Sequence, residues 1–138
     1  MLTLSPPLSA DPKWLKGIAP YTLSKMGMTM LTLGLAADEA EHAVAGNCLW
    51  PRTLIATAVV QNLLGGDAAM AQARTPEIYA DAAHEILRRD PRACTGNAFI
   101  DDEVLAEAGV TDFSVYKEAE GELALDLFVD DWGPSAQT

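Results

Sequence analysis

The chain has 138 residues, of which 49% are hydrophobic, and this composition fits one packed domain, or part of a larger one, and argues against disorder. The net charge is −11 at pH 7, and residues 101–138 hold eleven acidic residues and one lysine. No cluster of basic residues offers a surface for a phosphate backbone or an anionic bilayer. We therefore expect neither nucleic acid nor a membrane as a partner.

Taken in chain order, the elements expected are a strand over residues 1–5, a loop over 6–19, a helix over 21–42, a strand over 43–51, a short helix or lid-like segment over 53–66, a helix over 75–91, a strand over 95–101, a short acidic helix over 101–110 and a last strand over 122–132. The helix over 75–91 carries the clearest signals, because Thr75 can cap it and Pro76 fits its first turn. Strands that alternate with helices indicate an α/β fold with a parallel sheet.

The helix expected over residues 21–42 is apolar around most of its circumference. Such a helix must be covered on two sides, and a small sheet covers only one of them. Gly27 and Gly34 also fall within this helix, where each costs up to about 1 kcal/mol relative to alanine. We therefore expect a second subunit, or further chain, on the other side of this helix, and we expect a homo-oligomer formed through it.

Tyr21 and Lys25 stand four residues apart at the start of this helix, and this spacing places both side chains on one face. An ammonium group favours the phenolate by on the order of 4 kcal/mol at about 4 Å in a medium of intermediate dielectric constant. The pair can therefore work as a general acid/base near neutral pH, with Ser5 at the end of the preceding strand as a hydroxyl donor to a carbonyl oxygen. The alternative is an ordinary contact on a helix surface.

Other residue types give fewer signals. Cys48 and Cys94 lie far apart in apolar or small-residue surroundings, where free thiols in a reducing compartment are the simplest interpretation. Asp101, Asp102 and Glu103 fit an acidic helix start better than a cation site. The first residues have no basic region before an apolar run, so no secretory signal is indicated. We expect a cytoplasmic chain without a metal site.

Four motifs occur in a characteristic order: SPP at residues 5–7, YTLSK at 21–25, NCLWPRT at 47–53 and TGNAFIDD at 95–102. Together they resemble the second half of the short-chain dehydrogenase/reductase family, and most of all its hydroxysteroid dehydrogenase-like branch. The resemblance covers nearly the whole chain. It implies the second half of a doubly wound, Rossmann-like parallel sheet, and hydride transfer between NAD or NADP and a small carbonyl or alcohol substrate.

The same resemblance implies roles for individual residues. Ser5 matches the serine that polarises the substrate carbonyl, Tyr21 the acid/base, and Lys25 the lysine that holds the nicotinamide ribose and lowers the tyrosine pKa. Pro51 and the residues after it match the segment that contacts the nicotinamide carboxamide, which makes Thr53, Ile55 and Thr57 candidate cofactor contacts, beside Tyr21 and Lys25 themselves. Two departures from the family pattern, Arg52 in place of the usual glycine and Thr57 six residues after Pro51, leave open which threonine makes the contact.

The sequence contains no counterpart of the glycine-rich turn that holds the pyrophosphate in this family. Residues 1–138 are therefore expected to form a partial domain, the catalytic half without the dinucleotide-binding half, in contact only with the nicotinamide end of the cofactor. A truncated reading frame, a fragment or a split gene would each explain this, and NAD cannot be told from NADP. Two hypotheses follow: part of an oxidoreductase that is inactive alone, or a non-catalytic remnant that dimerises or binds an intact relative.

Overall fold

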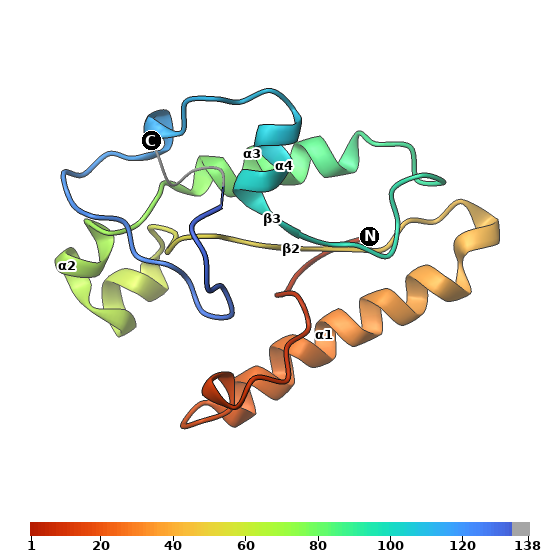
Figure 1. The fold of residues 1–138 in the computed structure, drawn as a ribbon, viewed down its shortest axis with the longest axis horizontal. Helices are drawn as coiled ribbons and strands as arrows, with labels where there is room; N and C mark the ends of the chain where they lie inside the picture. Colours follow the sequence, from red (N-terminus) through yellow and green to blue (C-terminus); the bar gives the residue numbers. More distant parts are fainter. Residues whose placement is uncertain (134–138) are drawn as a thin grey trace. The chain divides into compact units, whose positions relative to one another are not determined.

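The computed structural model describes residues 1–133, and the chain divides into two compact units. The first unit comprises Met1–Trp50 and Ile86–Ile100. The second unit comprises Pro51–Glu85 and the described residues from Asp101 onward. The chain passes between the units at the ends of two strands and within one helix (Figure 1).

The first unit contains a sheet of three parallel strands in the order β1–β2–β3. Its strands are β1 (Leu2–Leu4), β2 (Asn47–Trp50) and β3 (Ala98–Ile100). Every residue of the central strand β2 is buried, as expected for a strand with neighbours on both sides. The three strands expected around residues 1–5, 43–51 and 95–101 and their parallel arrangement are confirmed.

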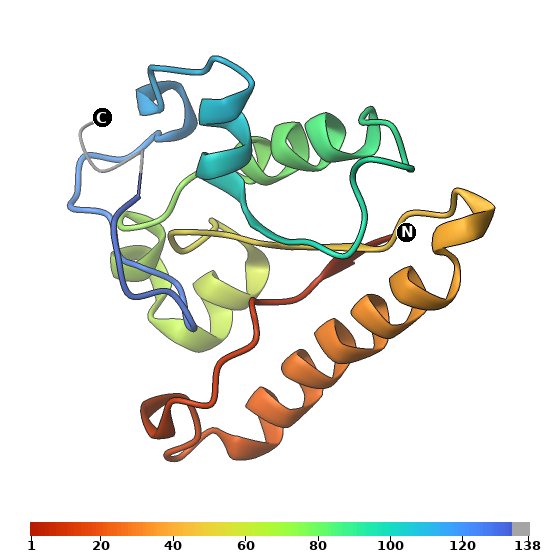
Figure 2. The same ribbon diagram turned by 45° about the vertical axis from the view of Figure 1, so that its right-hand side comes forward.

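The long helix α1 (Ala19–Asp38) lies against β1 and β2, and Figure 2 shows it along one face of the sheet. It ends four residues before the expected boundary, and a 3₁₀ turn follows at Ala40–His42. Acidic side chains gather in this region, at the negative end of the helix dipole, where they disfavour further helix. Ala43 then takes the left-handed conformation with φ 57° and turns the chain toward β2.

The buried stripe of α1 consists of small and hydroxyl-bearing side chains, in place of the Leu and Met residues that its composition suggested. Its members are Thr22, Thr29, Thr32 and Ala36. Thr32 Oγ1 lies 2.7 Å from Thr3 Oγ1 on β1, so hydroxyl pairs replace part of the expected apolar contact. The close approach is visible at Gly46, where a Cβ atom would stand 3.0 Å from the main-chain oxygen of Thr32. The Leu and Met side chains of α1 therefore point largely outward.

The second unit has little regular sheet. After Pro51 the chain is extended, then forms a π-helical turn (Val60–Leu64) and α2 (Gly66–Met70). The helix α3 (Pro76–Leu87) follows with its last two residues in the first unit, and α4 (Asp101–Glu107) follows β3. The helical segment ends at Gly65, which has φ 149° and fits the expected end at residues 65–66, and Gly66 is the first residue of α2.

The last expected strand, over residues 122–132, is wrong. Within the described residues, that segment forms only one isolated antiparallel bridge, between Leu125 and Thr53. Phe128 adopts φ 70°, in the left-handed region, and this turns the chain where a strand would have to continue. The alternating apolar pattern of residues 122–132 therefore belongs to a segment that packs on one side over a short distance.

Two further findings concern the chain as described, residues 1–133. Cys48 and Cys94 are both buried and both free thiols, so the prediction that they form no disulfide is confirmed. None of the helices in this range is both long and apolar enough to cross a membrane.

Candidate functional site

Ser5 directly follows β1, at the carboxyl edge of the parallel sheet. Its side chain is fully buried, and its amide donates to the main-chain oxygen of Thr3. Thr29 on α1 places Oγ1 2.8 Å from Ser5 Oγ and 2.7 Å from the main-chain oxygen of Pro6. Since the carbonyl of Pro6 can only accept, one threonine hydroxyl ties both residues to the helix. The hydroxyl of Ser5 is thus held at a fixed place beside α1.

Lys25 reaches the same place from α1. Its Nζ donates to the main-chain oxygen of Leu4, at 3.1 Å, and lies 5.3 Å from the ring centroid of Trp50 at the end of β2. Leu4 is the neighbour of Ser5, so the structure brings two of the three candidate catalytic residues together at the ends of β1 and β2. The aromatic ring and the carbonyl dipole both favour a cation here.

Tyr21 lies in the first turn of α1, and its side chain is 43% exposed. It stands one turn before Lys25, and Lys25 one turn before Thr29, so the three residues share one face of the helix. That face runs past the end of β1, where Ser5 lies. The sequence reasoning missed Thr29, although the same four-residue spacing after Lys25 could have indicated it.

Apart from Tyr21 and Lys25, the candidate cofactor-contacting residues lie in the second unit, in the segment that begins at Pro51. Main-chain hydrogen bonds hold alternate residues of this segment: Leu54 donates to Ala124, and Ala56 donates to Arg74. In the part of the chain that the structure describes, no main-chain hydrogen bond is made by Thr53 or Ile55. Thr53 is fully buried and Ile55 is 8% exposed, so the main-chain groups of Ile55 are the ones that a ligand can use.

The two candidate threonines differ sharply in environment. The Thr53 side chain is fully buried, and its hydroxyl donates to the main-chain oxygen of Leu54 at 3.3 Å. Thr57 is exposed, and its hydroxyl accepts from the amide of Val60 at 3.4 Å, as a cap of the helical turn that follows. A ligand can reach the hydroxyl of Thr57, whereas that of Thr53 is enclosed.

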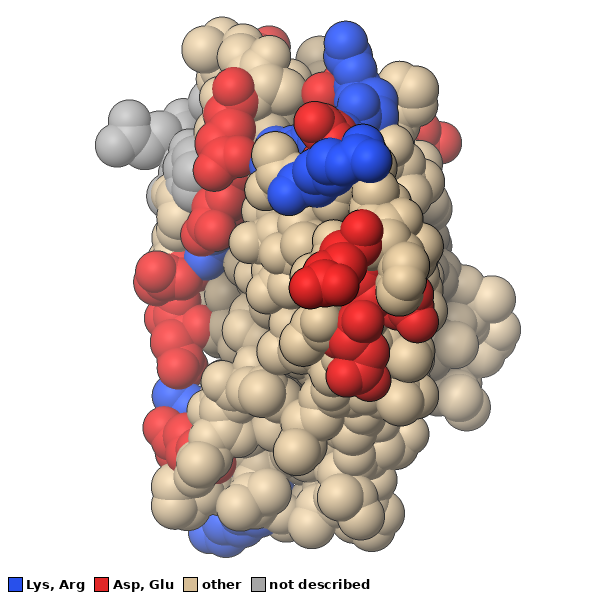
Figure 3. All heavy atoms as spheres, turned by 90° about the vertical axis from the view of Figure 1, so that its right-hand side faces the viewer, with Lys and Arg blue, Asp and Glu red and all other residues tan. Residues whose placement is uncertain are grey.

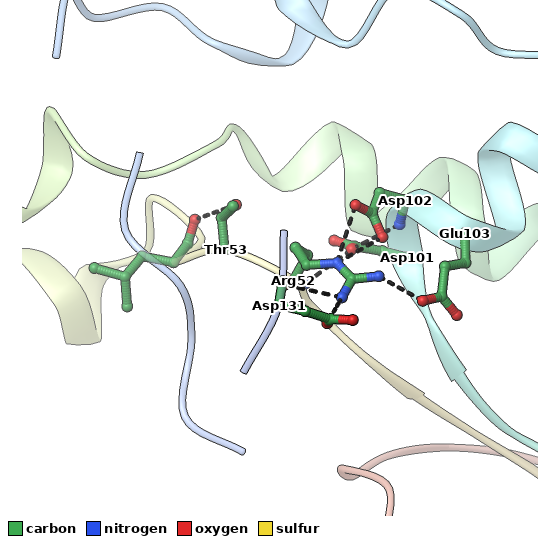
Figure 4. Close-up of polar contacts among 7 residues, drawn as sticks. Arg52, Thr53, Asp101, Asp102, Glu103 and Asp131 are labelled. Atoms are coloured by element: carbon green, nitrogen blue, oxygen red, sulfur yellow. Dashed lines mark hydrogen bonds and ion pairs between the residues drawn. The ribbon is translucent and has the colours of Figure 1, made fainter. Parts of the chain in front are cut away.

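Arg52, which the sequence marked only as a departure from the family pattern, is the centre of a buried ionic cluster (Figure 4). Its side chain is 2% exposed, and its three guanidinium nitrogens contact three different carboxylates. The distances are 3.1 Å from Nε to Asp102, 2.5 Å from Nη2 to Glu103 and 2.5 Å from Nη1 to Asp131. Its amide also donates to Asp101 Oδ1 at 2.9 Å.

The expected acidic helix start is confirmed, because α4 begins with Asp101, Asp102 and Glu103, but the carboxylates of Asp101 and Asp102 are both fully buried. Their partner is an arginine about fifty residues earlier in the chain, and this is why local sequence did not reveal it. Burial raises the pKa of Asp101 to about 7, against the lowering effect of the Arg52 amide, and the charge of Asp102 adds to the rise. Among the described residues, Asp101 Oδ2 has no hydrogen-bond partner.

Charge and ligand chemistry limit what else the chain can bind. On the face drawn in Figure 3, acidic side chains cover more of the surface than basic ones, in line with the net charge of −11. Within residues 1–133, no group of three or more histidine, cysteine, aspartate or glutamate side chains is placed to hold a metal ion.

No family model matches this chain. Among curated proteins it is similar to hydroxysteroid dehydrogenase-like protein 2 of several vertebrates. The rat protein is 44% identical over 132 residues, which are 95% of this chain and 25% of the rat protein. The Xenopus tropicalis protein is 43% identical over 136 residues, 99% of this chain and 32% of that protein. The human protein is 41% identical over 133 residues, 96% of this chain and 31% of that protein.

Two solved structures are also similar. A short chain dehydrogenase of Mycobacterium thermoresistibile has a TM-score of 0.84 and 51% identity, over 97% of this chain and 47% of that one. A Xanthomonas campestris protein described as a dehydrogenase has a TM-score of 0.87 and 50% identity, over 94% of this chain and 47% of that one. The chain thus spans about half of each solved protein and a quarter to a third of the curated relatives. The predicted fold class, half of a doubly wound α/β sheet, is confirmed.

Proposed function

Because the chain belongs to the short-chain dehydrogenase/reductase family, in its hydroxysteroid dehydrogenase-like branch, we propose that it carries the proton-transfer residues of a nicotinamide-dependent oxidoreductase. The substrate would be a small molecule with a carbonyl or alcohol group. The observation that supports this most directly is the meeting of Lys25 and Ser5 at the end of β1, on the helix face that also bears Tyr21.

Each residue of this group has one task in the proposal. Tyr21 transfers a proton between its Oη and the substrate oxygen, and its partial exposure leaves it accessible to a small molecule. The ammonium group of Lys25, one helical turn away, favours the phenolate. With a substrate bound, the hydroxyl of Ser5 turns its proton from Thr29 Oγ1 to the substrate oxygen while charge develops there, and the helix keeps Ser5 in place.

A nicotinamide cofactor, when bound, would give or take the hydride. Each unit has residues that fit the nicotinamide end of this cofactor. In the first unit, Lys25 can donate to a ribose hydroxyl. In the second unit, the main-chain groups of Ile55 suit a carboxamide, and the exposed Thr57 hydroxyl lies in the same segment. Pro51 begins this segment and fixes its direction. The sequence offers no glycine-rich turn for the pyrophosphate, so we propose that these 138 residues act together with a separate dinucleotide-binding half.

The test is to join the chain to the N-terminal half of the related Mycobacterium thermoresistibile dehydrogenase, and to assay oxidation of NADH and NADPH with a panel of small ketones and aldehydes. Turnover that depends on Tyr21 supports the proposal. A folded hybrid that binds cofactor and never turns over any carbonyl or alcohol would refute it.

A second candidate function is favoured by the outer face of α1. Leu23, Met30 and Leu31 are 77%, 64% and 65% exposed, although they are large and apolar. Such a face is unfavourable in water and suits contact with another copy of the chain or with an intact relative. Under this hypothesis the chain is a non-catalytic remnant whose role is association. The hybrid enzyme distinguishes the two hypotheses, because only the first requires turnover.

A further inference from the structure

The extended segment after Pro51 is held by hydrogen bonds on alternate residues. Leu54 donates to Ala124, and the amide of Asp126 donates to the main-chain oxygen of Arg52. Arg74 exchanges two hydrogen bonds with the segment, as donor to Leu54 and as acceptor from Ala56. The bonded groups of residues 52, 54 and 56 point toward one edge of the extended chain, so those of residues 53 and 55 point toward the other edge. Thr53 is fully buried and Ile55 is 8% exposed, so the main-chain groups of Ile55 are the ones left for a ligand. The register of this segment therefore decides which groups a ligand meets.

Arg52 is the residue that couples this register to the rest of the second unit. Its amide is bonded to Asp101 and its carbonyl to Asp126, so both of its main-chain groups are fixed. Its guanidinium joins α4, through Asp102 and Glu103, to Asp131 beyond the edge segment 124–126. The cluster therefore fixes the segment at its first residue and also fixes one of the two parts of the chain that are bonded to it.

We propose that Arg52 is a positioning residue, which sets the register of residues 53–57 so that the main-chain groups of Ile55 face the ligand. It touches neither substrate nor cofactor. The proposal rests on the proposed function only for the identity of that ligand, the nicotinamide end of a dinucleotide. Its geometric part concerns the chain alone.

The arrangement depends on the shape of the guanidinium as well as on its charge. Nε, Nη1 and Nη2 point in three fixed directions and meet three carboxylates from two separate parts of the chain. A lysine ammonium is a single point charge that cannot span them in this way. Two of the carboxylates, those of Glu103 and Asp131, are 51% and 80% exposed, so the buried and specific part of the cluster is the contact with Asp102.

The experiment is amide hydrogen exchange, followed by mass spectrometry, on the full 138-residue chain. Exchange in peptides that contain residues 52–57 measures local opening of the segment. Exchange in peptides within α3 measures opening of the second unit as a whole. Arg52→Lys keeps the positive charge but removes the three guanidinium nitrogens that contact three carboxylates. Ile78→Ala is the matched control, because Ile78 is fully buried in the core of the same unit and outside the cluster. Reduced nicotinamide mononucleotide is the probe for the ligand-facing groups.

We expect Arg52→Lys to accelerate exchange in peptides of residues 52–57 by about tenfold or more relative to α3, since local opening is governed by local contacts. Ile78→Ala should accelerate both regions together. In the wild-type chain, the mononucleotide should slow exchange in residues 53–57, and Arg52→Lys should remove that protection. Glu103→Gln weakens only a half-exposed contact of Arg52, so it should accelerate exchange in the same peptides by a smaller factor. This variant replaces Arg52→Lys in the experiment if Arg52→Lys does not fold.

Unchanged relative exchange at residues 52–57 in both Arg52→Lys and Glu103→Gln would overturn the positioning role. A different outcome would separate it from the proposed function: if Arg52→Lys loosens the segment selectively while the mononucleotide gives no protection in the wild-type chain, the positioning role stands and the nicotinamide contact fails.

Discussion

Thr29 Oγ1 lies 2.8 Å from Ser5 Oγ, so the helix that carries Tyr21 and Lys25 also holds the hydroxyl proposed to support the substrate oxygen. The three residues of the proposed proton-transfer group are thus all held by one helix. A shift of α1 would move the acid/base and the hydroxyl together, which keeps their relative geometry.

The first prediction concerns this hydroxyl pair. Thr29→Val keeps the side-chain shape and removes a hydroxyl that donates to the main-chain oxygen of Pro6 and accepts from Ser5 Oγ, so we expect a loss of about 1–3 kcal/mol in the free energy of unfolding, measured with urea. In the hybrid enzyme, Thr29→Val should also lower kcat, because Ser5 loses its fixed position. Thr32→Val is the matched control, since it removes a similar hydroxyl that bonds Thr3 and not Ser5. An equal loss of kcat in both variants would contradict the role of Thr29.

The second prediction separates the acid/base from its electrostatic partner. In the hybrid enzyme, Tyr21→Phe should abolish turnover and leave cofactor affinity nearly unchanged, because the phenol acts on the proton. Lys25→Ala should weaken both, because it removes a ribose contact and the charge that favours the phenolate. Tyr79→Phe is the control for loss of a phenol elsewhere. Near-full activity of Tyr21→Phe would leave the Tyr21–Lys25 pair as a surface contact of the helix.

Much of the first unit follows from local sequence, and much of the second does not. The strands around residues 1–5, 43–51 and 95–101 were predictable from short apolar runs bounded by proline or polar residues, and α1 from its length. The inner stripe of α1 was not, because hydroxyl pairing with β1 requires knowledge of the partner strand.

The ionic cluster around Arg52 shows more clearly that local sequence does not reveal tertiary partners. Asp101 and Asp102 carry the local signature of an acidic helix start, and Arg52 stands where the family pattern usually has a glycine. Each becomes a buried group only through the other, across about fifty residues of sequence. Burial of paired charges is decided by tertiary structure, and no periodic pattern in either segment encodes it.

The third prediction concerns pH. The pKa of Asp101 is raised from 3.8 to about 7 in the folded chain, so the folded state holds a proton that the unfolded state has lost between these values. The contribution of Asp101 to stability is therefore fully present below about pH 4 and falls as the pH rises toward about 7. Asp101→Asn stays neutral and should flatten this fall, as measured by urea unfolding across that range.

Asp112→Asn is the control for this experiment. Hydrogen bonds from Ser114 lower the pKa of Asp112, so its contribution has the opposite sign and is lost as the pH falls. Asp112→Asn should therefore change the profile only below about pH 4, and its profile should run parallel to that of the wild type in the range where Asp101 titrates. Superimposable profiles of the wild-type chain and Asp101→Asn would show that the Asp101 carboxyl titrates normally.

The fourth prediction concerns association. With Leu23, Met30 and Leu31 exposed on α1, we expect the purified chain to dimerise or aggregate at micromolar concentration, in sedimentation experiments. Leu31→Arg should shift the population toward the monomer of 14.7 kDa. Leu87→Arg is the control, because Leu87 is also 65% exposed but lies on α3. A folded, monodisperse wild-type monomer would exclude α1 as an association surface under these conditions.

The last prediction concerns the 138-residue chain by itself. A dinucleotide is bound mainly through its pyrophosphate and adenine ribose, and the residues that would do so are absent from this sequence. The contacts proposed here, from Lys25 and residues 53–57, serve the nicotinamide end only. They must also offset the entropy of immobilising a flexible ligand, and the net charge of −11 opposes a polyanion at low salt.

We therefore expect the isolated chain to bind NADH and NADPH more weakly than about 1 mM and to show no turnover. A titration followed by nicotinamide fluorescence, with calorimetry as a check, measures this directly. The hybrid enzyme, titrated in parallel, should bind far more tightly, because the added half supplies the pyrophosphate site and the dinucleotide is then held at both ends. Micromolar binding by the isolated chain would instead mean that these residues build a complete cofactor site of another kind, and the proposal of a separate dinucleotide-binding half would have to be given up.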